Sequence, residues 1–157
     1  MMSYFELDKT DISILHILQE NGKLTAIDIG EKVGLSPSPC ARRIRHLYSD
    51  GYITGVHASL NLKKLGIGVQ VIAQIRLSRH SETIVESFES AVENMPEVTD
   101  CFTVSGDFDY MLRVICLDNE AYEKWVRRLQ KLDLINTIDS RFVIRSVKES
   151  GPILLTK

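Results

Sequence analysis

The spacing of the apolar residues changes near Val69, and this change constrains the fold more than any other feature of the sequence. Before Val69, apolar residues recur at every third or fourth position, which is the period of an amphipathic helix. From Val69 to Leu77, every second residue is apolar, which is the period of a strand. The 157 residues are therefore expected to form two small domains of the α+β class, the first helical and the second built around strands.

Two helices are predicted at the start of the chain. Asp8 is a favourable N-cap, and Asp11 three residues later gives a pattern close to a capping box. The helix that follows ends at Asn21-Gly22. Thr25 is expected to cap a second helix, which ends at Gly34.

A third helix is predicted over the stretch Leu35–Leu47, continuing to Tyr48. Two prolines stand at its start, where a helix tolerates them because its first N–H groups lack partners. Cys40, Ile44 and Leu47 form one apolar stripe. The remaining circumference is basic, with Arg42, Arg43, Arg45 and His46. A basic helix alone is equally well a solvated surface helix, but three short helices ending in a basic one favour a helix-turn-helix that binds DNA.

The segment after these helices leaves two alternatives. Tyr52–Leu60 alternates enough to predict either a strand pair forming a small wing or a single extended segment. Residues 61–68 contain two lysines and two glycines and are predicted to be a linker. The expected division is thus 1–60 for the DNA-binding domain with its following strand, 61–68 for the linker and 69–157 for the second domain.

The second domain is predicted to have the order β-α-β-β-α-β, the ferredoxin-like split unit. Its expected elements are a strand from Val69, a helix from Ile84 to Met95, strands at Val98–Val104 and Tyr110–Leu117, a helix from Asn119 and a last strand at Thr137–Val147. Two helices cover only one face of such a sheet. The other face is expected to carry Phe102, Val104, Leu112, Val114, Phe142 and Ile144, which is too apolar to leave in water. A dimer through the second domain is therefore predicted.

The sequence gives little support for metal binding, another cofactor or catalysis. The four histidines are isolated and no C-x-x-C occurs, so neither a metal nor another cofactor is expected. Cys40, Cys101 and Cys116 are predicted to be small buried side chains rather than nucleophiles, and Trp125 to belong to the core. Since nothing pairs a nucleophile with a base, an enzyme is not expected. The formal net charge of −2 does not exclude DNA, because affinity follows the local field of the basic helix.

The expected location is the cytoplasm. The first six residues lack the basic start and apolar run of a secretory signal. No apolar run is long enough to span a membrane, so no membrane partner is expected. The odd number of widely spaced cysteines fits a reducing compartment.

Three motifs resemble those of the Lrp/AsnC regulators of bacteria and archaea. They are Leu-Ser-Pro-Ser-Pro-Cys with its following arginines (Leu35–Arg45), Gly51-Tyr52-Ile53 with Gly55, and Val-Ser-Gly-Asp-Phe-Asp-Tyr (Val104–Tyr110). The resemblance implies a winged helix-turn-helix joined to a ligand-sensing α/β-sandwich domain. It also implies homodimers that assemble into octamers, bind double-stranded DNA of the nucleoid and respond to an amino acid.

The resemblance further implies which residues act. Those expected to contact DNA are Ser36, Ser38, Arg42, Arg43, Arg45 and His46. Those expected to bind the effector between dimers are Gly106, Asp107, Phe108, Asp109, Tyr110 and Ser140. Backbone N–H groups of a glycine loop can hold a carboxylate, and Asp107 or Asp109 can pair with an ammonium group. The alternative for this motif is a tight hairpin whose aspartates satisfy the turn.

One departure from the family pattern affects the expected ligand. Many relatives carry Pro-Gly before the last strand, where this chain has Asp133-Leu134-Ile135. Asp139, Arg141 and Arg145 lie nearby and can change the side-chain preference of the cleft. The predicted function is a sequence-specific transcriptional regulator whose assembly or DNA affinity responds to an amino acid. The alternative is an oligomeric small-molecule sensor that acts through protein contacts without binding DNA.

Overall fold

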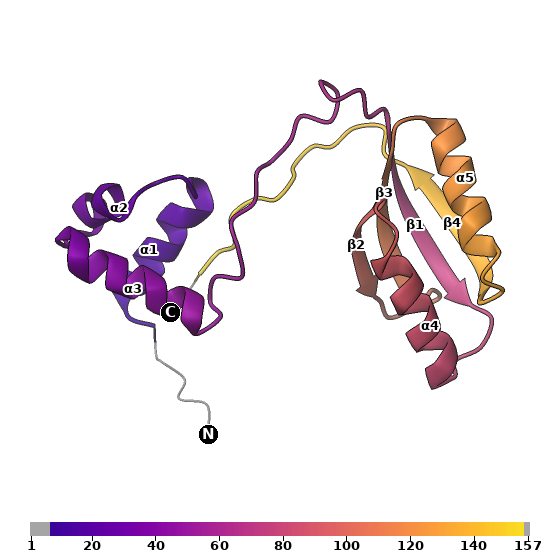
Figure 1. Ribbon diagram of the computed structural model, residues 1–157, viewed down its shortest axis with the longest axis horizontal. Helices are drawn as coiled ribbons and strands as arrows, with labels where there is room; N and C mark the ends of the chain where they lie inside the picture. The colour runs from indigo at the N-terminus through magenta and orange to yellow at the C-terminus, as the bar shows by residue number, and fades with distance from the viewer. Residues whose placement is uncertain (1–6, 156–157) are drawn as a thin grey trace. The chain divides into compact units, whose positions relative to one another are not determined.

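The computed structural model describes residues 7–155. The six N-terminal residues, on which the expectation about a secretory signal rests, lie outside the described part. The chain forms two compact units (Figure 1). The helical unit runs to Ser59 and includes the chain from Lys148 onward, whereas the sheet unit is Leu60–Val147. The predicted ranges differ from this division chiefly at the C-terminus, since the segment from Lys148 packs on the helical unit.

The helical unit contains α1 (Lys9–Glu20), α2 (Ala26–Val33) and α3 (Pro37–Ser49). Both predicted N-caps are confirmed. An Asp8 carboxylate oxygen accepts a hydrogen bond from the Asp11 N–H at 2.8 Å, and the Thr25 hydroxyl accepts one from the Asp28 N–H at 3.2 Å. The N–H of each cap residue donates the reciprocal bond of a capping box to the carboxylate three residues later. Gly34 ends α2 with a φ of 71°, a conformation that glycine adopts without steric cost.

The core of the helical unit is small. Its fully or nearly fully buried side chains are Ile14, Leu15, Ile29, Cys40 and Leu47. The predicted apolar stripe of α3 is therefore confirmed, with Ile44 half-buried at its edge. After α3, no residue in the described segment 52–60 belongs to a strand. The single extended segment, and not a strand pair, is thus the alternative found, and the Ile53 N–H anchors it to the Leu47 carbonyl oxygen at 3.0 Å.

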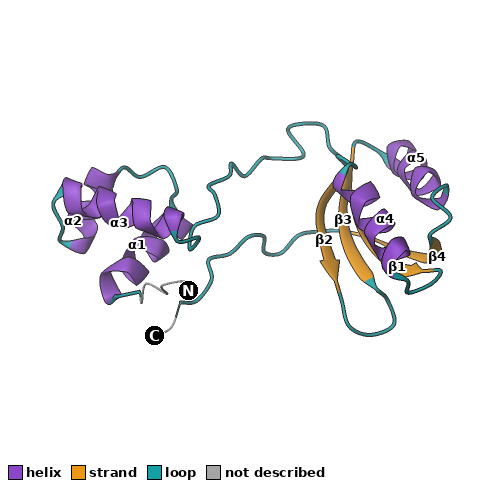
Figure 2. Ribbon diagram, turned by 60° about the horizontal axis from the view of Figure 1, so that its bottom comes forward, coloured by secondary structure: helices purple, strands orange, loops and turns teal. Residues whose placement is uncertain are grey.

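The sheet unit has the predicted order. Its elements are β1 (Val69–Leu77), α4 (Glu82–Glu93), β2 (Val98–Thr103), β3 (Tyr110–Cys116), α5 (Asn119–Gln130) and β4 (Ile135–Phe142). The strands form one antiparallel sheet in the order β2-β3-β1-β4, and both helices cover the same face (Figure 2). The last strand begins earlier than predicted and stops at Phe142, because its partner β1 begins only at Val69 and its ladder with β4 ends there.

The side chains found on the two faces of the sheet differ from those predicted. Leu112 and Val114 are fully buried beneath the helices, and the Phe142 ring packs against the Tyr122 ring of α5 at 5.3 Å. The open face instead carries the alternate set of side chains, Ile72, Gln74, Arg76, Phe102, Met111, Arg113, Ile115, Asp139 and Arg141. It is therefore mixed, with apolar side chains surrounded by charged ones. Trp125 lies in the core as predicted.

No helix among the described residues is long and apolar enough to cross a bilayer.

Candidate DNA-binding helix and effector loop

The face of α3 opposite its buried stripe is basic and accessible. Ser38, Arg42 and Arg45 stand at i, i+4 and i+7, so they lie on one side of the helix. All three are exposed, as is Ser36, the N-cap, whose side chain makes no capping hydrogen bond. No acidic residue occurs between Ser36 and Ser49. Two guanidinium groups and two hydroxyl groups can thus reach phosphates and base edges together.

Arg43 does not belong to this face. Its guanidinium nitrogen lies 2.8 Å from a carboxylate oxygen of Asp8 and 2.8 Å from one of Asp11, so it joins α3 to the N-terminus of α1. Asp11 is 3% exposed, and Arg43 is the cation that compensates its charge. Arg43 was predicted to contact DNA, but its side chain is already engaged in ion pairs within the protein. His46 lies on the same flank, in a hollow of about 300 Å³ that Asp50 and Tyr52 also line.

The predicted effector loop is a tight hairpin between β2 and β3. Gly106 has a φ of 114°, which side chains rarely adopt. The Asp109 N–H donates to the Ile75 carbonyl oxygen at 2.8 Å, and an Asp109 carboxylate oxygen accepts from the Leu77 N–H at 2.7 Å. The Asp109 carboxylate therefore satisfies the backbone of β1 and not, as the hairpin alternative expects, that of the turn itself. Asp107 differs: it is exposed, and its carboxylate has no partner among the described residues.

Two residues that lie beside this loop, Arg76 and His80, were not predicted from the sequence to do so. Arg76 donates from Nε to the Asp107 carbonyl oxygen at 2.7 Å, and its guanidinium carbon lies 5.4 Å from the centre of the Phe108 ring. The His80 Nδ1 lies 3.6 Å from an Asp109 carboxylate oxygen. Arg76 belongs to the polar half of the β1 alternation, and its position on the open face was the available signal.

Tyr110 and Ser140 lie apart from the loop tip. Both side chains are on the helix-covered face, where Tyr110 donates to a Glu89 carboxylate oxygen at 2.7 Å and Ser140 accepts from the Tyr122 hydroxyl at 2.6 Å. Burial, together with the bond to Glu89, raises the pKa of Tyr110 to about 12. The structure thus brings Gly106–Asp109 together with Arg76, but it does not bring Ser140 to them.

The comparisons with known proteins match both units. Residues 7–54 match the winged helix-turn-helix DNA-binding family, and residues 70–153 match the Lrp/AsnC ligand binding domain. The chain belongs to the Lrp/AsnC family. It is 39% identical over 150 residues to the leucine-responsive regulatory protein of Haemophilus influenzae, covering 95% of this chain and 90% of the relative. Against the Escherichia coli (strain K12) protein of that name, the identity is 36% over 151 residues, 96% of this chain and 92% of the relative.

Two solved structures agree over nearly the whole chain. A transcriptional regulator of Neisseria meningitidis in complex with L-Met has a TM-score of 0.90 and 35% identity, covering 95% of this chain and 97% of that one. An AsnC family transcriptional regulator from Agrobacterium tumefaciens has a TM-score of 0.85 and 37% identity, covering 91% and 94%. This Lrp/AsnC protein is accordingly a DNA-binding transcriptional regulator with a ligand-binding domain.

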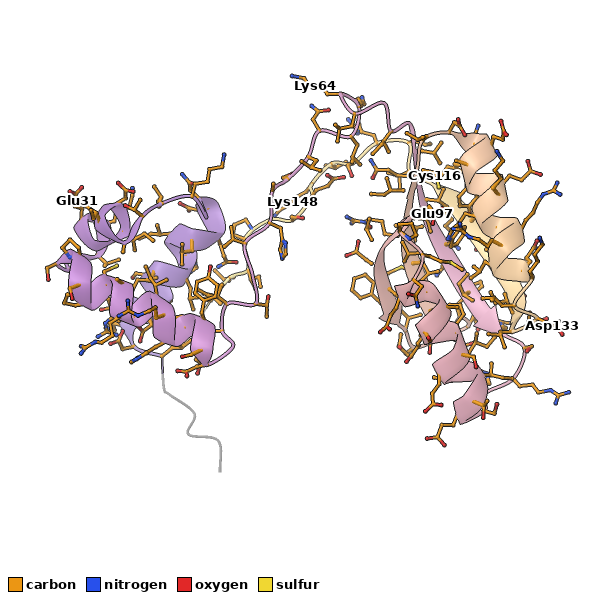
Figure 3. The ribbon with its side chains drawn as sticks, viewed as in Figure 1. Glu31, Lys64, Glu97, Cys116, Asp133 and Lys148 are labelled. Carbon is orange, nitrogen blue, oxygen red and sulfur yellow. The ribbon has the colours of Figure 1, made fainter. Side chains whose placement is uncertain are left out.

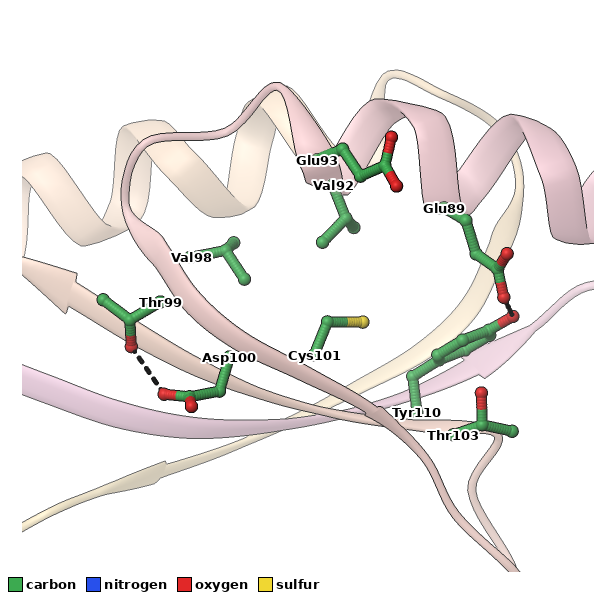
Figure 4. A pocket seen from close by; sticks show the side chains of 9 residues that line it. All are labelled: Glu89, Val92, Glu93, Val98, Thr99, Asp100, Cys101, Thr103 and Tyr110. Carbon is green, nitrogen blue, oxygen red and sulfur yellow. Dashed lines mark hydrogen bonds between the residues drawn. The ribbon is translucent and has the colours of Figure 1, made fainter. Parts of the chain in front are cut away.

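A groove of about 330 Å³ separates α4 from the edge strand β2 in this Lrp/AsnC protein (Figure 4). It is acidic, with Glu89, Glu93 and Asp100 in its lining and no basic side chain. An amino acid would leave its carboxylate uncompensated there, so the groove alone does not suit such a ligand. Cys101 also lines it and is exposed, in contrast to the prediction of a buried side chain.

The departure from the family pattern before the last strand has a structural counterpart. Asp133, labelled in Figure 3 near the end of α5, has a φ of 52°, in the left-handed region. Asp139 and Arg141 pair with each other at 3.0 Å on the open face, and Arg145 lies beyond the end of the sheet. Arg141 is therefore partly neutralised by its own strand.

Proposed function

We propose that the exposed face of α3 is the surface that reads double-stranded DNA. The observation that carries this proposal is the alignment of Ser38, Arg42 and Arg45 opposite the buried stripe, with the third arginine of the helix held in an internal ion pair. Ser36 and His46 flank this surface at the start and on one side. The reading surface is therefore narrower than the six residues that the sequence predicts, because Arg43 supports it from inside.

Two copies are needed for firm binding. Each helical unit offers only two uncompensated arginines on α3, which gives little electrostatic affinity for a single copy. We infer a homodimer through the open sheet face, where the exposed Phe102 and the neighbouring Ile72, Met111 and Ile115 form an apolar surface. Dimers assemble further, up to an octamer, and present pairs of α3 helices to half-sites.

The proposed effector is an amino acid held at the tip of the β2–β3 hairpin. The relative from Neisseria meningitidis was solved with L-Met, which is the reason to consider this ligand class. Asp107 offers a carboxylate for the ammonium group. Gly106 offers a backbone N–H and Arg76 a guanidinium group for the carboxylate. Since this loop is open on one side, the site is completed by a neighbouring dimer.

The relatives are regulators. We therefore infer that this chain acts on nucleoid DNA in the cytoplasm and carries no catalytic activity. Among the described residues, no group of three His, Cys, Asp or Glu side chains could hold a metal ion. Neither a metal nor another cofactor has a place in the proposal.

Charge reversal on α3 tests the DNA-binding surface. Changing Arg42→Glu and Arg45→Glu should abolish binding to the promoter upstream of the protein's own gene, because attraction to phosphates becomes repulsion. The matched control is Lys9→Glu with Lys23→Glu, which alters the same charge on exposed positions outside α3. Gel-shift titration measures the affinity, and sedimentation confirms that the oligomer is intact. Unchanged DNA binding in the α3 variant would favour the alternative function through protein contacts.

A thermal-shift screen of the twenty amino acids at millimolar concentration tests the effector site. At least one should raise Tm, because a ligand that binds the folded state stabilises it. Asp107→Asn should remove that increase, whereas Glu86→Gln, on the exposed side of α4, should keep it. An equal increase in Tm for the Asp107 variant would place the ligand elsewhere.

A further inference from the structure

The C-terminal segment makes two hydrogen bonds with one side chain of the helical unit, that of Gln19. The Ile153 N–H donates to Gln19 Oε1 at 2.6 Å, and Gln19 Nε2 donates to the Ile153 carbonyl oxygen at 3.4 Å. The amide of Gln19 therefore offers the same donor and acceptor pair as a neighbouring strand. Gln19 and Ile153 are 134 positions apart in the sequence, so this contact closes nearly the whole chain into a loop.

Apolar contacts accompany these hydrogen bonds. Leu155 packs against the core of the helical unit. A hollow of about 320 Å³ lies beside Ile153 and Leu155 and is lined by α1 and by the segment that follows α3, through Leu15, Leu18, Tyr52, Ile53, Thr54, Gly55 and Val56. The docking surface thus includes the segment that leads directly away from the DNA-reading helix.

The chain passes between the two units twice, so the contact of Ile153 with Gln19 affects how the helical unit is attached. The chain first passes from the helical unit to the sheet unit at Ser59–Leu60, and it returns at Val147–Lys148 (Figure 3 labels Lys148). Because the returning segment is fixed at Gln19, the helical unit is attached to the sheet unit by two stretches of chain. One flexible connection permits broad reorientation, whereas a second attachment point removes much of that freedom.

We propose that residues 148–155 are a second tether that limits the reorientation of the helical unit, and with it the range of spacings at which a dimer presents its two α3 helices. The proposal rests on the DNA-reading dimer of the proposed function. Gln19 is the positioning residue: its side-chain amide bonds to the tether, and the residue lies on the exposed side of α1. Its amide supplies the hydrogen bonds of the second attachment.

Hydrogen exchange in the full chain tests the docking without DNA. The Ile153 amide should exchange at least about tenfold more slowly than an unprotected amide, and Gln19→Ala should remove this protection while α1 stays protected. Glu20→Ala, at the neighbouring exposed position, is the matched control and should leave Ile153 protected. Unprotected exchange of Ile153 in the unaltered protein would overturn the tether.

Half-site spacing tests the consequence. Inserting five base pairs, about half a helical turn, between the half-sites of the promoter should weaken binding of the unaltered protein at least tenfold. In Gln19→Ala, and in a chain ending at Gly151, the loss should fall below about threefold, because a singly attached unit can follow the displaced half-site. An equal loss in all chains would overturn the tether. Absence of DNA binding in the unaltered protein would refute the proposed function instead, and with it the role of the tether in spacing.

Discussion

The helical unit and the sheet unit are stabilised in different ways. Among the described residues, five hydrophobic side chains are buried in the core of the helical unit and fourteen in that of the sheet unit. The helical unit adds two capping boxes, which are local, and the Arg43–Asp11 ion pair, which joins residues 32 positions apart. The sheet unit depends on strands paired across long stretches of sequence. Removing one polar group should therefore matter more in the helical unit, and removing one core side chain should matter most in the sheet unit.

The largest expected effect is loss of the aromatic core of the sheet unit. Trp125 is 1% exposed and stacks on Tyr122 with ring centres 5.5 Å apart. Trp125→Ala should destabilise the sheet unit by about 3–5 kcal/mol through lost burial and the cavity left behind. Scanning calorimetry should show this transition falling while the transition of the helical unit stays in place. Equal falls in both would show that the two cores unfold as one.

The second effect is loss of the ion pair in the helical unit. Arg43→Met should destabilise it by about 2 kcal/mol, because Asp11 keeps a buried charge without its partner while Arg43 itself was partly exposed. Arg42→Met removes the same charge from the exposed face and should cost less than about 0.5 kcal/mol. Urea unfolding followed by circular dichroism compares the two. Equal costs would contradict the structural role assigned to Arg43.

The third effect is a dependence on pH in the helical unit. The backbone hydrogen bond from Asp11, aided by Arg43, lowers the pKa of Asp8, and hydrogen bonds from Thr25 lower the pKa of Asp28. A carboxyl group with a pKa lowered on folding contributes stability above its unfolded pKa of about 3.9 and loses it as pH falls through its folded value. The Tm of the helical unit should therefore fall as the pH is lowered below about 4.

Substitution by asparagine isolates these two carboxylates. Asp8→Asn with Asp28→Asn keeps a side-chain oxygen at the N-cap of α1 and at the N3 position of α2 but removes the titrating groups. Its Tm should be lower than that of the unaltered protein at pH 7 and should change less between pH 5 and pH 3. Parallel pH profiles of the two proteins, followed by circular dichroism, would assign the acid sensitivity to other groups.

The smallest effect is a gain in the sheet unit. Asp133 has a φ of 52°, a conformation that costs a residue with a side chain more than it costs glycine. Asp133→Gly should stabilise the sheet unit by about 0.5 kcal/mol, the strain relieved being partly offset by the greater freedom of the unfolded chain. Urea titration monitored by Trp125 fluorescence measures the gain, and a loss of similar size would show that the aspartate side chain has a stabilising role.

The same difference between the units explains what the sequence predicts. Asp8, Thr25 and Gly34 act on residues within one turn of themselves, so the helices and their caps could be predicted. The alternation of apolar and polar residues in β1 similarly predicted the strand and its buried side. The order of elements in the sheet unit followed from the positions of turns and periodic segments.

The parts that could not be predicted depend on distant partners. In β3, Leu112 and Val114 alternate with Met111, Arg113 and Ile115, so apolar residues occur on both faces and only Arg113 marks the open one. Arg43 differs from Arg42 only through carboxylates that another helix supplies. The docking of Ile153 on Gln19 leaves no periodic signal at all.

The salt dependence of promoter binding tests most directly the claim that one face of α3 reads DNA while Arg43 supports it. The slope of log affinity against log salt reports the number of phosphates neutralised. Replacing Arg42 and Arg45 by alanine should lower this slope by about two per helical unit. Arg43→Met, measured at a temperature where it remains folded, should leave the slope unchanged. A lower slope in the Arg43 variant, or an unchanged one in the double variant, would contradict the account.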